Sequence, residues 1–441
     1  MGHLKKGYIL RNSEGQMVEV IHMIAAGGQG EVYKVRIGSK HYALKWYFPP
    51  TNPQQQEQAG EQLVSLREFL LQNSPPDSRF LWPLSMIMDK KKNSFGYIME
   101  LLEPRFQGLE KLVLGRMRPI PKFNILCKAA INLAESFRKL HNMGACYKDI
   151  NLGGPFLDPN TGDIRICDTD NVRINKTPGN IIFIFFAAPE LIRNEGICQT
   201  NTDIHSLAVL LFYMFVRHHP LDGKRELKIN VFNEIAQREF YGKNPIFIYD
   251  PQNDSNRPVP GFHDAAIRNW KLYPSFLKRL FTRAFTDGLH EPNKRVREGE
   301  WMEAFSKLRD CLYYCSECGS ENFYDFERED QGEHQVCWRC NQKSRLPMRL
   351  DIGDRKIFLN YNSALYPHHL GKRLDFSRTI AEVNQHPQNP RKWGLKNLSV
   401  STWSFTGKNG TVINVEKERS LPLRTGLEVN FGAVQGKLIS R

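Results

Sequence analysis

The hydrophobic pattern of this chain changes its period near Pro121, and that change limits the fold more than any single motif does. Before Pro121, alternating apolar runs bounded by turn residues predict strands over residues 17–23, 31–37, 41–47 and 96–101. Apolar residues at helical spacing predict one helix among them, over 54–72. After Pro121, a 3.6-residue period predicts helices over 125–140, 202–216, 231–237, 274–285 and 301–312. We therefore expect an α+β fold, with a strand-rich lobe followed by a helix-rich lobe.

Beyond Cys311 the helical period ends, and two further segments follow. Four cysteines stand in two close pairs, and the rest of the chain has short apolar runs separated by turn signals such as Thr425-Gly426. This pattern predicts three parts. They are a two-lobed domain at 1–312, with lobes 1–102 and 103–312, a cysteine-rich segment at 313–345 and a β-rich docking module at 346–441.

Composition and charge exclude few functions. Of the 441 residues, 41% are hydrophobic and 11% aromatic, and the formal net charge of +14 fits an anionic partner or, as the favoured interpretation, a solvated basic surface. The basic residues lie in short, scattered groups without interleaved aromatic residues, so we do not expect a nucleic-acid partner. The first residues lack the apolar core of a signal peptide, and the longest apolar runs are shorter than a membrane span. We expect a cytoplasmic protein without membrane contact.

A glycine cluster between two predicted strands is the first candidate phosphate-binding element. It contains Gly27, Gly28 and Gly30. Glycines let backbone N–H groups approach a phosphate, although a tight hairpin explains the same residues. The next strand leads to Lys45, which is flanked by apolar residues and would need an anionic partner if buried. Glu68, on the predicted helix, is the preferred partner and Glu61 the second choice, although either acid also fits a solvated helix face.

Six further motifs follow in a fixed order. They are Met99-Glu100-Leu101-Leu102, Tyr147-Lys148-Asp149-Ile150-Asn151, Cys167-Asp168-Thr169-Asp170, Ala188-Pro189-Glu190, Asp203 and Pro292-Asn293-Lys294-Arg295. Together with Lys45, this order resembles the protein kinase superfamily. The resemblance implies that Asp149 accepts or orients the proton of the attacking hydroxyl, that Lys45 contacts the α- and β-phosphates of ATP, and that Asp168 holds magnesium.

The same resemblance implies an ATP site and a structural framework. The ATP site would comprise Gly27, Gly28, Gly30, Val32, Ala43, Lys45, Glu68, Met99, Glu100 and Leu102. In the framework, Glu190 would pair with Arg295, and Asp203 would anchor the loop that carries Asp149.

Three departures from the kinase pattern favour an inactive pseudokinase. Gly154 stands where kinases place a second magnesium-binding Asn, Asp170 replaces the glycine of the metal-binding segment, and Ala25 replaces the first glycine of the loop. Magnesium prefers near-octahedral oxygen coordination, so a lost amide must be replaced. We expect Asp168, Asp170 and Asn151 to be the magnesium ligands.

The cysteine pairs predict a zinc ribbon. Cys315 and Cys318 form one Cys-x-x-Cys pair, and Cys337 and Cys340 form the other, 18 residues further on. This spacing is typical of two knuckles that bind one tetrahedral zinc, and it favours a structural metal over a redox role. We expect strands at 322–326 and 333–338 to form the hairpin between the pairs.

The β-rich tail loosely resembles forkhead-associated phosphopeptide-binding sandwiches. The resemblance rests on Trp393-Gly394-Leu395-Lys396-Asn397-Leu398-Ser399, Asn409-Gly410-Thr411 and Phe431-Gly432. The arginine and the Ser-x-x-His element with which such modules bind phosphothreonine are not evident. We expect a β-sandwich-like docking module, with phosphopeptide binding as the less favoured alternative.

The combination of these parts resembles bacterial Ser/Thr kinases of the tellurium-resistance-associated phosphorylation triad. Further shared motifs are Ala43-Leu44-Lys45-Trp46-Tyr47-Phe48, Phe80-Leu81-Trp82-Pro83, Cys167-Asp168-Thr169-Asp170-Asn171-Val172 and Asp203-Ile204-His205-Ser206-Leu207. The resemblance implies a von Willebrand A-type protein and a PP2C-type phosphatase as partners. It therefore implies a bacterial signalling or stress-response kinase that uses ATP, magnesium (or manganese) and zinc.

Two alternatives remain open at this point. A pseudokinase scaffold would assemble partner proteins through the zinc ribbon and the tail, and Gly154 favours it. A nucleic-acid-binding zinc-ribbon protein is favoured only by the net charge, and a steep dependence of binding on salt would support it.

Overall fold

The structure is a computed structural model that describes residues 2–89, 91–176, 184–407 and 409–440. The chain forms two compact units, one from residues 1–121, 132–266 and 281–298, the other from residues 122–131, 267–280 and 299–441. The second unit thus joins the cysteine-rich segment and the tail to three segments of the predicted helical lobe. No helix in the described part of the chain is both long and apolar enough to cross a membrane.

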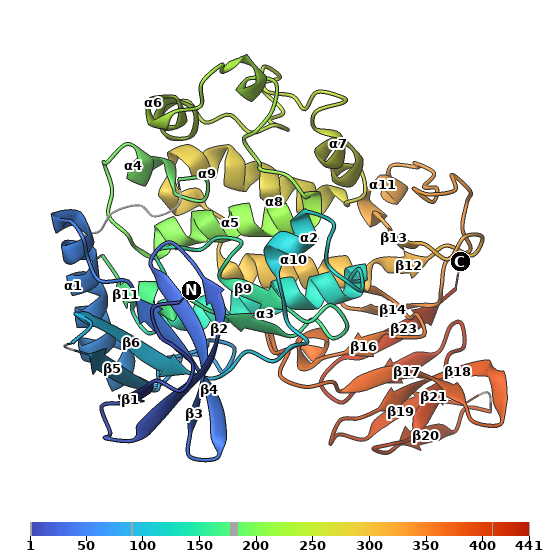
Figure 1. The fold of residues 1–441 in the computed structure, drawn as a ribbon. Coiled ribbons are helices and arrows are strands. Elements are labelled where there is room, and N and C mark those ends of the chain that lie inside the picture. Colours follow the sequence, from blue (N-terminus) through green and yellow to red (C-terminus); the bar gives the residue numbers. More distant parts are fainter. Residues whose placement is uncertain (1, 90, 177–183, 408, 441) are drawn as a thin grey trace. The chain divides into compact units, whose positions relative to one another are not determined.

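The first unit begins with a six-stranded antiparallel sheet (Figure 1). Its order is β1 (Ile9–Arg11), β2 (Met17–Ala26), β3 (Gly30–Ile37), β4 (Lys40–Tyr47), β6 (Ser94–Met99) and β5 (Ser85–Asp89). The two edge strands meet where Asn12 bridges to Ile87 and the Ser13 amide donates to the Met86 carbonyl at 2.8 Å. The sheet therefore curls round an apolar core that includes Val18, Tyr33, Leu44 and Trp46. The short strands β1 and β5 were missed by the sequence prediction.

Helix α1 (Pro53–Glu68) follows β4. Pro53 stands at the first turn and the Asn52 side chain caps the helix by accepting from the Gln55 amide at 2.9 Å. A 3-10 turn (Leu70–Gln72) ends the segment. The predicted helix over 54–72 is confirmed in kind and is shorter than expected.

The helical part begins after two short elements, β7 (Gln107–Gly108) and α2 (Leu109–Val113). Its helices are α3 (Phe123–Asn142), α4 (Pro189–Ile192), α5 (Thr200–Val216), α6 (Glu234–Gln237), α7 (Asp264–Trp270), α8 (Ser275–Phe285), α9 (Asp287–His290) and α10 (Glu298–Asp310). Short strands also occur here, namely β8 (Ala145–Cys146), β9 (Pro155–Leu157), β10 (Ile164–Ile166) and β11 (Arg173–Ile174). Almost all of α5 is buried, which explains its nearly continuous apolar sequence.

In the second unit, β12 (Leu312–Tyr314) pairs with β13 (Glu321–Phe323), and α11 (Phe326–Asp330) follows. The hairpin predicted between 322–326 and 333–338 is wrong. The first of these segments pairs with a strand that precedes the cysteines, and the second contains no strand. Strand alternation alone does not identify a strand's partner.

The tail is a sandwich of two antiparallel sheets (Figure 1). One has the order β15 (Arg355–Phe358), β14 (Arg349–Ile352), β23 (Gln435–Ile439), β22 (Glu428–Asn430), β19 (Trp403–Thr406) and β20 (Val412–Val415). The other has the order β16 (Ala364–Leu365), β17 (Ala381–His386), β18 (Asn389–Asn397) and β21 (Ser420–Pro422). Residues from both sheets, including Leu350, Leu395 and Trp403, share one core.

Candidate functional site

Lys45 lies on β4, in the middle of the first sheet, opposite Val32 on β3 and Tyr97 on β6. Its ammonium group donates to Asp168 Oδ1 at 2.8 Å and to both carboxylate oxygens of Asp170, at 2.8 and 3.0 Å. Burial would lower the pKa of Lys45, but the two carboxylates raise it well above its usual value. Lys45, Asp168 and Asp170 are called the lysine centre below.

Asp170 is the closed side of the lysine centre. Its side chain is 0% exposed and also accepts hydrogen bonds from the hydroxyls of Tyr47 and Tyr97. Burial opposes ionisation, yet Lys45 and the two tyrosines together lower the pKa of Asp170. Asp170 is therefore a buried, charged acceptor with its oxygens occupied.

Asp168 is the open side of the lysine centre. Its side chain is 45% exposed, and its backbone has the left-handed conformation at φ 52° and ψ 37°. Asp adopts this conformation more readily than most residues. The adjacent Thr169 is buried, and its hydroxyl donates to the Leu81 carbonyl at 3.0 Å. A free carboxylate edge next to Lys45 suits a magnesium ion bound to phosphates.

The loop that carries Asp149 is anchored by Asp203 on α5. The Asp203 carboxylate accepts from the backbone amides of Tyr147 and Lys148, the latter at 3.1 Å, and contacts His141 Nε2 at 3.1 Å. The other ring nitrogen of His141 contacts Glu298. Although burial opposes it, these two carboxylates raise the pKa of His141 to about 9. His141, Asp203 and Glu298 are called the anchor centre below.

Asp149 itself is half-buried. Burial, with a contribution from Asp168, raises the pKa of Asp149 to about 7, while Lys45 and a hydrogen bond with Asn151 oppose the shift. Asn171 places its amide nitrogen 3.5 Å from Asp149 Oδ2. A carboxylate with a pKa near neutrality is suited to receive a proton at cellular pH.

Residues near Gly154 have roles within the loop. The Asn151 side chain donates to the Asp149 carbonyl at 3.0 Å and accepts from the Gly153 amide at 2.7 Å. The Gly154 carbonyl accepts from the Cys167 amide at 2.9 Å, and a Cβ at Gly154 would lie 3.1 Å from the Tyr147 hydroxyl. The magnesium roles of Asn151 and Asp170 stay predictions, and both side chains have other partners here.

The expected ion pair between Lys45 and a helix acid is wrong. Glu68 is exposed, and Glu61 Oε2 lies 3.6 Å from the ammonium of Lys148 instead. The buried face of α1 makes other contacts: Gln62 donates to the Gln29 side chain at 3.0 Å, and the Ser65 hydroxyl donates to the Val172 carbonyl at 2.8 Å. The helical period of the sequence predicted which face of α1 is buried, but it did not predict which atoms that face contacts.

The glycine cluster forms the turn between β2 and β3. The Gly27 amide donates to the Gly30 carbonyl at 2.8 Å. A Cβ at Gly30 would stand 2.2 Å from the Trp46 carbonyl oxygen, so only glycine fits there, while Gly27 and Gly28 have open space around them. The hairpin interpretation is therefore confirmed, and the phosphate-binding role of the same turn stays a prediction.

The predicted pair of Glu190 and Arg295 is confirmed, and the ATP-binding roles of the other predicted residues stay predictions. Arg295 forms a two-pronged ion pair with Glu190, at 2.8 and 2.7 Å. Met99, buried at the end of β6, lies opposite Ala43, and Glu100 is exposed. The chemically important partners that the sequence analysis missed are Tyr47, Tyr97 and Asn171. Tyr47 had a signal in the sequence, because it lies two residues after Lys45 on the same strand and therefore on the same face.

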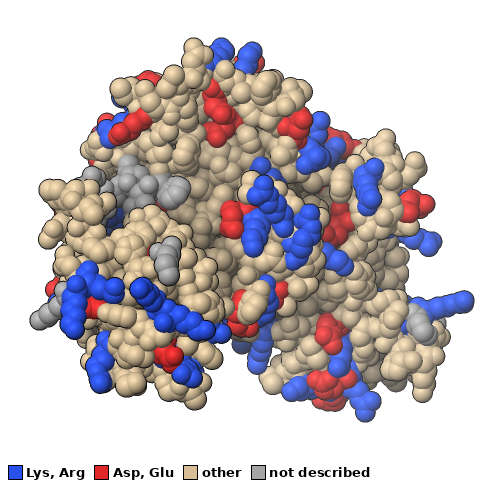
Figure 2. Space-filling model, in the orientation of Figure 1, with Lys and Arg blue, Asp and Glu red and all other residues tan. Residues whose placement is uncertain are grey.

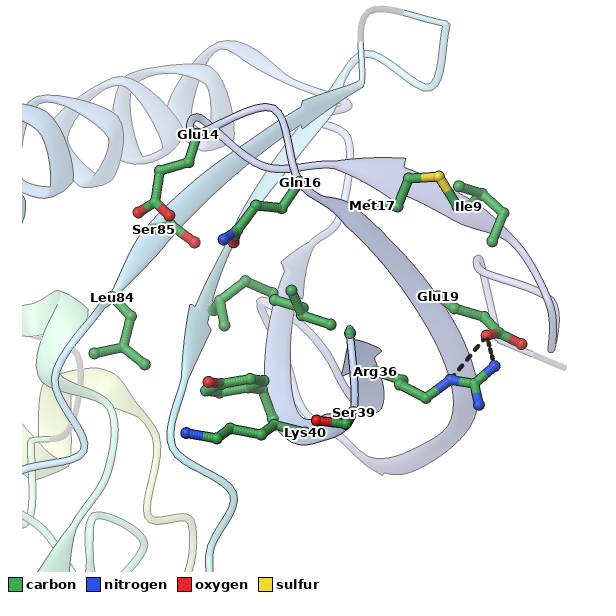
Figure 3. Close-up of a pocket in the computed structure, with 14 residues that line it drawn as sticks. Ile9, Glu14, Gln16, Met17, Glu19, Arg36, Ser39, Lys40, Leu84 and Ser85 are labelled. Carbon is green, nitrogen blue, oxygen red and sulfur yellow. Dashed lines mark hydrogen bonds and ion pairs between the residues drawn. The ribbon is translucent and has the colours of Figure 1, made fainter.

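A cavity of about 770 Å³ opens elsewhere in the first sheet (Figure 3). It is lined by residues of β1 to β6 and their turns, with an ion pair between Arg36 and Glu19 at its rim. None of the lysine-centre or Asp149-loop residues lines it. It is therefore separate from the candidate site.

In the second unit the four predicted cysteines come together. Their sulfur atoms all lie within 4.8 Å of one another, and the pairs Cys315–Cys340 and Cys318–Cys337 are 3.6 Å apart. Zinc–sulfur bonds of about 2.3 Å in a tetrahedron place sulfurs about 3.8 Å apart, so this group fits one metal ion. Gly319 takes a positive φ of 70° in the first knuckle, and the Asn322 side chain donates to Cys337 Sγ at 3.5 Å.

Comparison with known proteins supports the kinase resemblance. The protein kinase domain family matches residues 18–268, which is more than half of the chain. The chain belongs to the protein kinase family. The matched range contains the whole lysine centre and Asp149, and it ends before the cysteine group and the sandwich.

Two curated relatives are fungal kinases. Protein kinase gsk31 of Schizosaccharomyces pombe is 24% identical over 277 residues, which is 59% of this chain and 65% of the relative. Protein kinase MCK1 of Saccharomyces cerevisiae is 29% identical over 99 residues, which is 22% of this chain and 26% of the relative. The chain therefore spans less than two thirds of either relative. Membership of the kinase family implies ATP and magnesium as the ligands of the candidate site.

Proposed function

We propose that this protein is a Ser/Thr protein kinase that transfers the γ-phosphate of ATP to a hydroxyl of a protein substrate. The observation that carries the proposal is the ion pair of Lys45 with Asp168 at 2.8 Å, in the same segment as Asn171, whose amide nitrogen lies 3.5 Å from Asp149 Oδ2. Asp149 receives the proton of the attacking hydroxyl as the new oxygen–phosphorus bond forms and the bond to ADP breaks.

The other residues bind and orient. Lys45 holds the α- and β-phosphates, and the turn at Gly27, Gly28 and Gly30 covers them with backbone amides. Asp168 holds magnesium, with Asn151 as the further ligand in our proposal. Magnesium supplies positive charge that balances the transferring phosphoryl group.

We also propose that Cys315, Cys318, Cys337 and Cys340 bind a structural zinc. The sulfur spacing supports one ion, and four protein ligands leave no open coordination position for catalysis.

For the tail we propose a forkhead-associated-like docking module. The sandwich of six- and four-stranded sheets supports this proposal. Its loops contact α10 of the same unit, because His369 Nε2 lies 3.1 Å from Asp310 Oδ1 and Arg373 pairs with Glu303. These contacts join the sandwich to α10 within the second unit and support a docking role, and phosphopeptide binding stays the less favoured alternative.

The proposed setting rests on the sequence resemblance alone. It comprises a bacterial signalling or stress-response system, a cytoplasmic location and the von Willebrand A-type and PP2C-type partners. The fungal relatives give it no support.

A pseudokinase scaffold is the second candidate, because no amide stands at position 154 and Asp170 is committed to Lys45. The test is transfer from labelled ATP with magnesium or manganese, comparing the parent with Asp149→Asn and Asp168→Asn, and with Glu68→Gln as the matched control. Transfer by the parent and by Glu68→Gln but by neither aspartate variant supports the kinase. A folded, zinc-loaded parent that transfers nothing supports the scaffold.

A further inference from the structure

The lysine centre contains an acid whose role the kinase pattern does not assign. We propose that Asp170 is the positioning residue for Lys45, in place of a glutamate on helix α1. This inference rests on the proposed function, because positioning matters only if Lys45 handles ATP phosphates.

The side chains around Asp170 form a site that accommodates one buried carboxylate. Lys45 and Tyr47 are two residues apart on β4, so their side chains leave the same face of the sheet. Tyr97 is the cross-strand partner of Lys45 on β6. All three donate to Asp170, whose backbone carbonyl also accepts from Arg173.

The same contacts argue against Asp170 as a metal ligand. Its side chain is 0% exposed, and three donors occupy its two oxygens. Asp168, by contrast, keeps 45% of its side chain exposed while it shares Lys45. The two carboxylates divide the work: Asp168 is available to magnesium, and Asp170 holds the lysine.

Among the described residues of helix α1, no carboxylate contacts Lys45. Glu61 contacts Lys148, Gln62 contacts Gln29 and Ser65 contacts Val172. The acid partner of Lys45 therefore belongs to the metal-binding segment and is held by the sheet. A change in the α1 acids should leave phosphate binding intact.

The test measures nucleotide affinity, which needs no phosphate transfer. Fluorescent mant-ATP is titrated into the parent, Asp170→Asn, Tyr97→Phe and Glu68→Gln, once with EDTA and once with magnesium, and adenosine serves as a ligand without phosphates. We expect Asp170→Asn to weaken mant-ATP binding about tenfold in EDTA, as expected for loss of one charged contact, and to leave adenosine affinity unchanged. Tyr97→Phe should have a smaller effect of the same kind, and Glu68→Gln none.

Several results would overturn the proposal. One is mant-ATP binding by Asp170→Asn that is unchanged or tighter in EDTA and weaker only with magnesium, which would make Asp170 a metal ligand. Another is a loss in Glu68→Gln equal to that in Asp170→Asn. If Asp170→Asn does not fold, Tyr97→Phe decides, since it keeps every charge, and unchanged EDTA affinity there counts against the proposal.

The outcome is distinguishable from failure of the proposed kinase activity. A parent that binds mant-ATP but transfers no phosphate refutes the activity, while the EDTA titrations still judge Asp170. A parent that binds no nucleotide refutes both.

Discussion

The lysine centre and the anchor centre of the kinase domain use the same chemistry, buried carboxylates facing a cation, and they differ in how much remains accessible. In the anchor centre the side chains of His141, Asp203 and Glu298 are 4%, 2% and 8% exposed. In the lysine centre one carboxylate is fully buried and the other is 45% exposed. A closed centre fixes the backbone, whereas a half-open centre keeps one charged edge for a ligand. In the cysteine group, Cys315 and Cys337 are buried, while Cys318 and Cys340 are partly exposed.

The largest loss of stability should come from removing a metal ligand, or the metal itself, from the cysteine group. We expect Cys337→Ser, or zinc removal with a chelator, to unfold the segment from 312 to 345, because structural zinc contributes on the order of 10 kcal/mol in small zinc modules. Hydrogen exchange of β12 and β13 measures this. The affinity for mant-ATP should not change. A loss of affinity would show that nucleotide binding depends on the cysteine group.

Next in size is the anchor centre. Asp203→Asn removes the negative charge, leaves one acceptor oxygen for two backbone amides, and leaves a charged His141 without one of its carboxylate partners. We expect the free energy of unfolding to fall by about 3 kcal/mol in urea titrations. Asp168→Asn is the matched change in the half-open centre, and it should abolish transfer with a much smaller loss of stability. Equal losses of unfolding free energy in Asp203→Asn and Asp168→Asn would refute the distinction between a closed anchor centre and a half-open lysine centre.

The anchor centre should also make stability depend on pH. The pKa of folded His141, about 9, exceeds that of an unfolded histidine, so its stabilisation is complete below about pH 6.5 and is lost as pH rises through about 9. The shift corresponds to at most about 3 kcal/mol. Urea midpoints from pH 6 to 10 should fall more steeply for the parent than for His141→Gln. Parallel profiles would show that His141 is not charged in the folded protein.

The smallest expected effect concerns magnesium binding next to Asp168, on the exposed side of the lysine centre. Gly154→Asn restores an amide where kinases bind a second magnesium, and we expect transfer at limiting magnesium to rise a few-fold. Gly154→Ala is the control, since its Cβ meets the Tyr147 hydroxyl at 3.1 Å without adding a ligand. A rise in both variants would point to the loop backbone and not to metal binding.

The sequence predicted those site features that depend on motif order. The resemblance to protein kinases implied the roles of Lys45, Asp149 and Asp168 and the Glu190–Arg295 pair, and the spacing of the cysteines predicted the cysteine group. The partner of Lys45 was not predicted correctly, because helical periodicity identifies the buried face of α1 but not whether an acid on it reaches the lysine. The sequence shows Asp170 only as a second carboxylate near Asp168, and the tertiary structure is needed to show that it contacts Lys45 and two tyrosines.

The fold followed the same rule. Long periodic segments such as α5 were predicted well, since a buried helix leaves a continuous apolar signature. The two-residue and three-residue strands were missed or given wrong partners, because so few residues carry little alternation. β13 is the clearest case, since its partner β12 lies before the first cysteine pair.

The seam between Asn12 and Ile87 has a consequence for how the protein behaves at high concentration. Where a sheet's two outer strands hold each other, little main chain is left to recruit a foreign strand. The sandwich is different, because one of its edge strands, β20, exposes Val412 and Ile413 at 69% and 43%. Aggregation of this protein should therefore nucleate at β20. We expect Val412→Lys to reduce aggregation at high protein concentration.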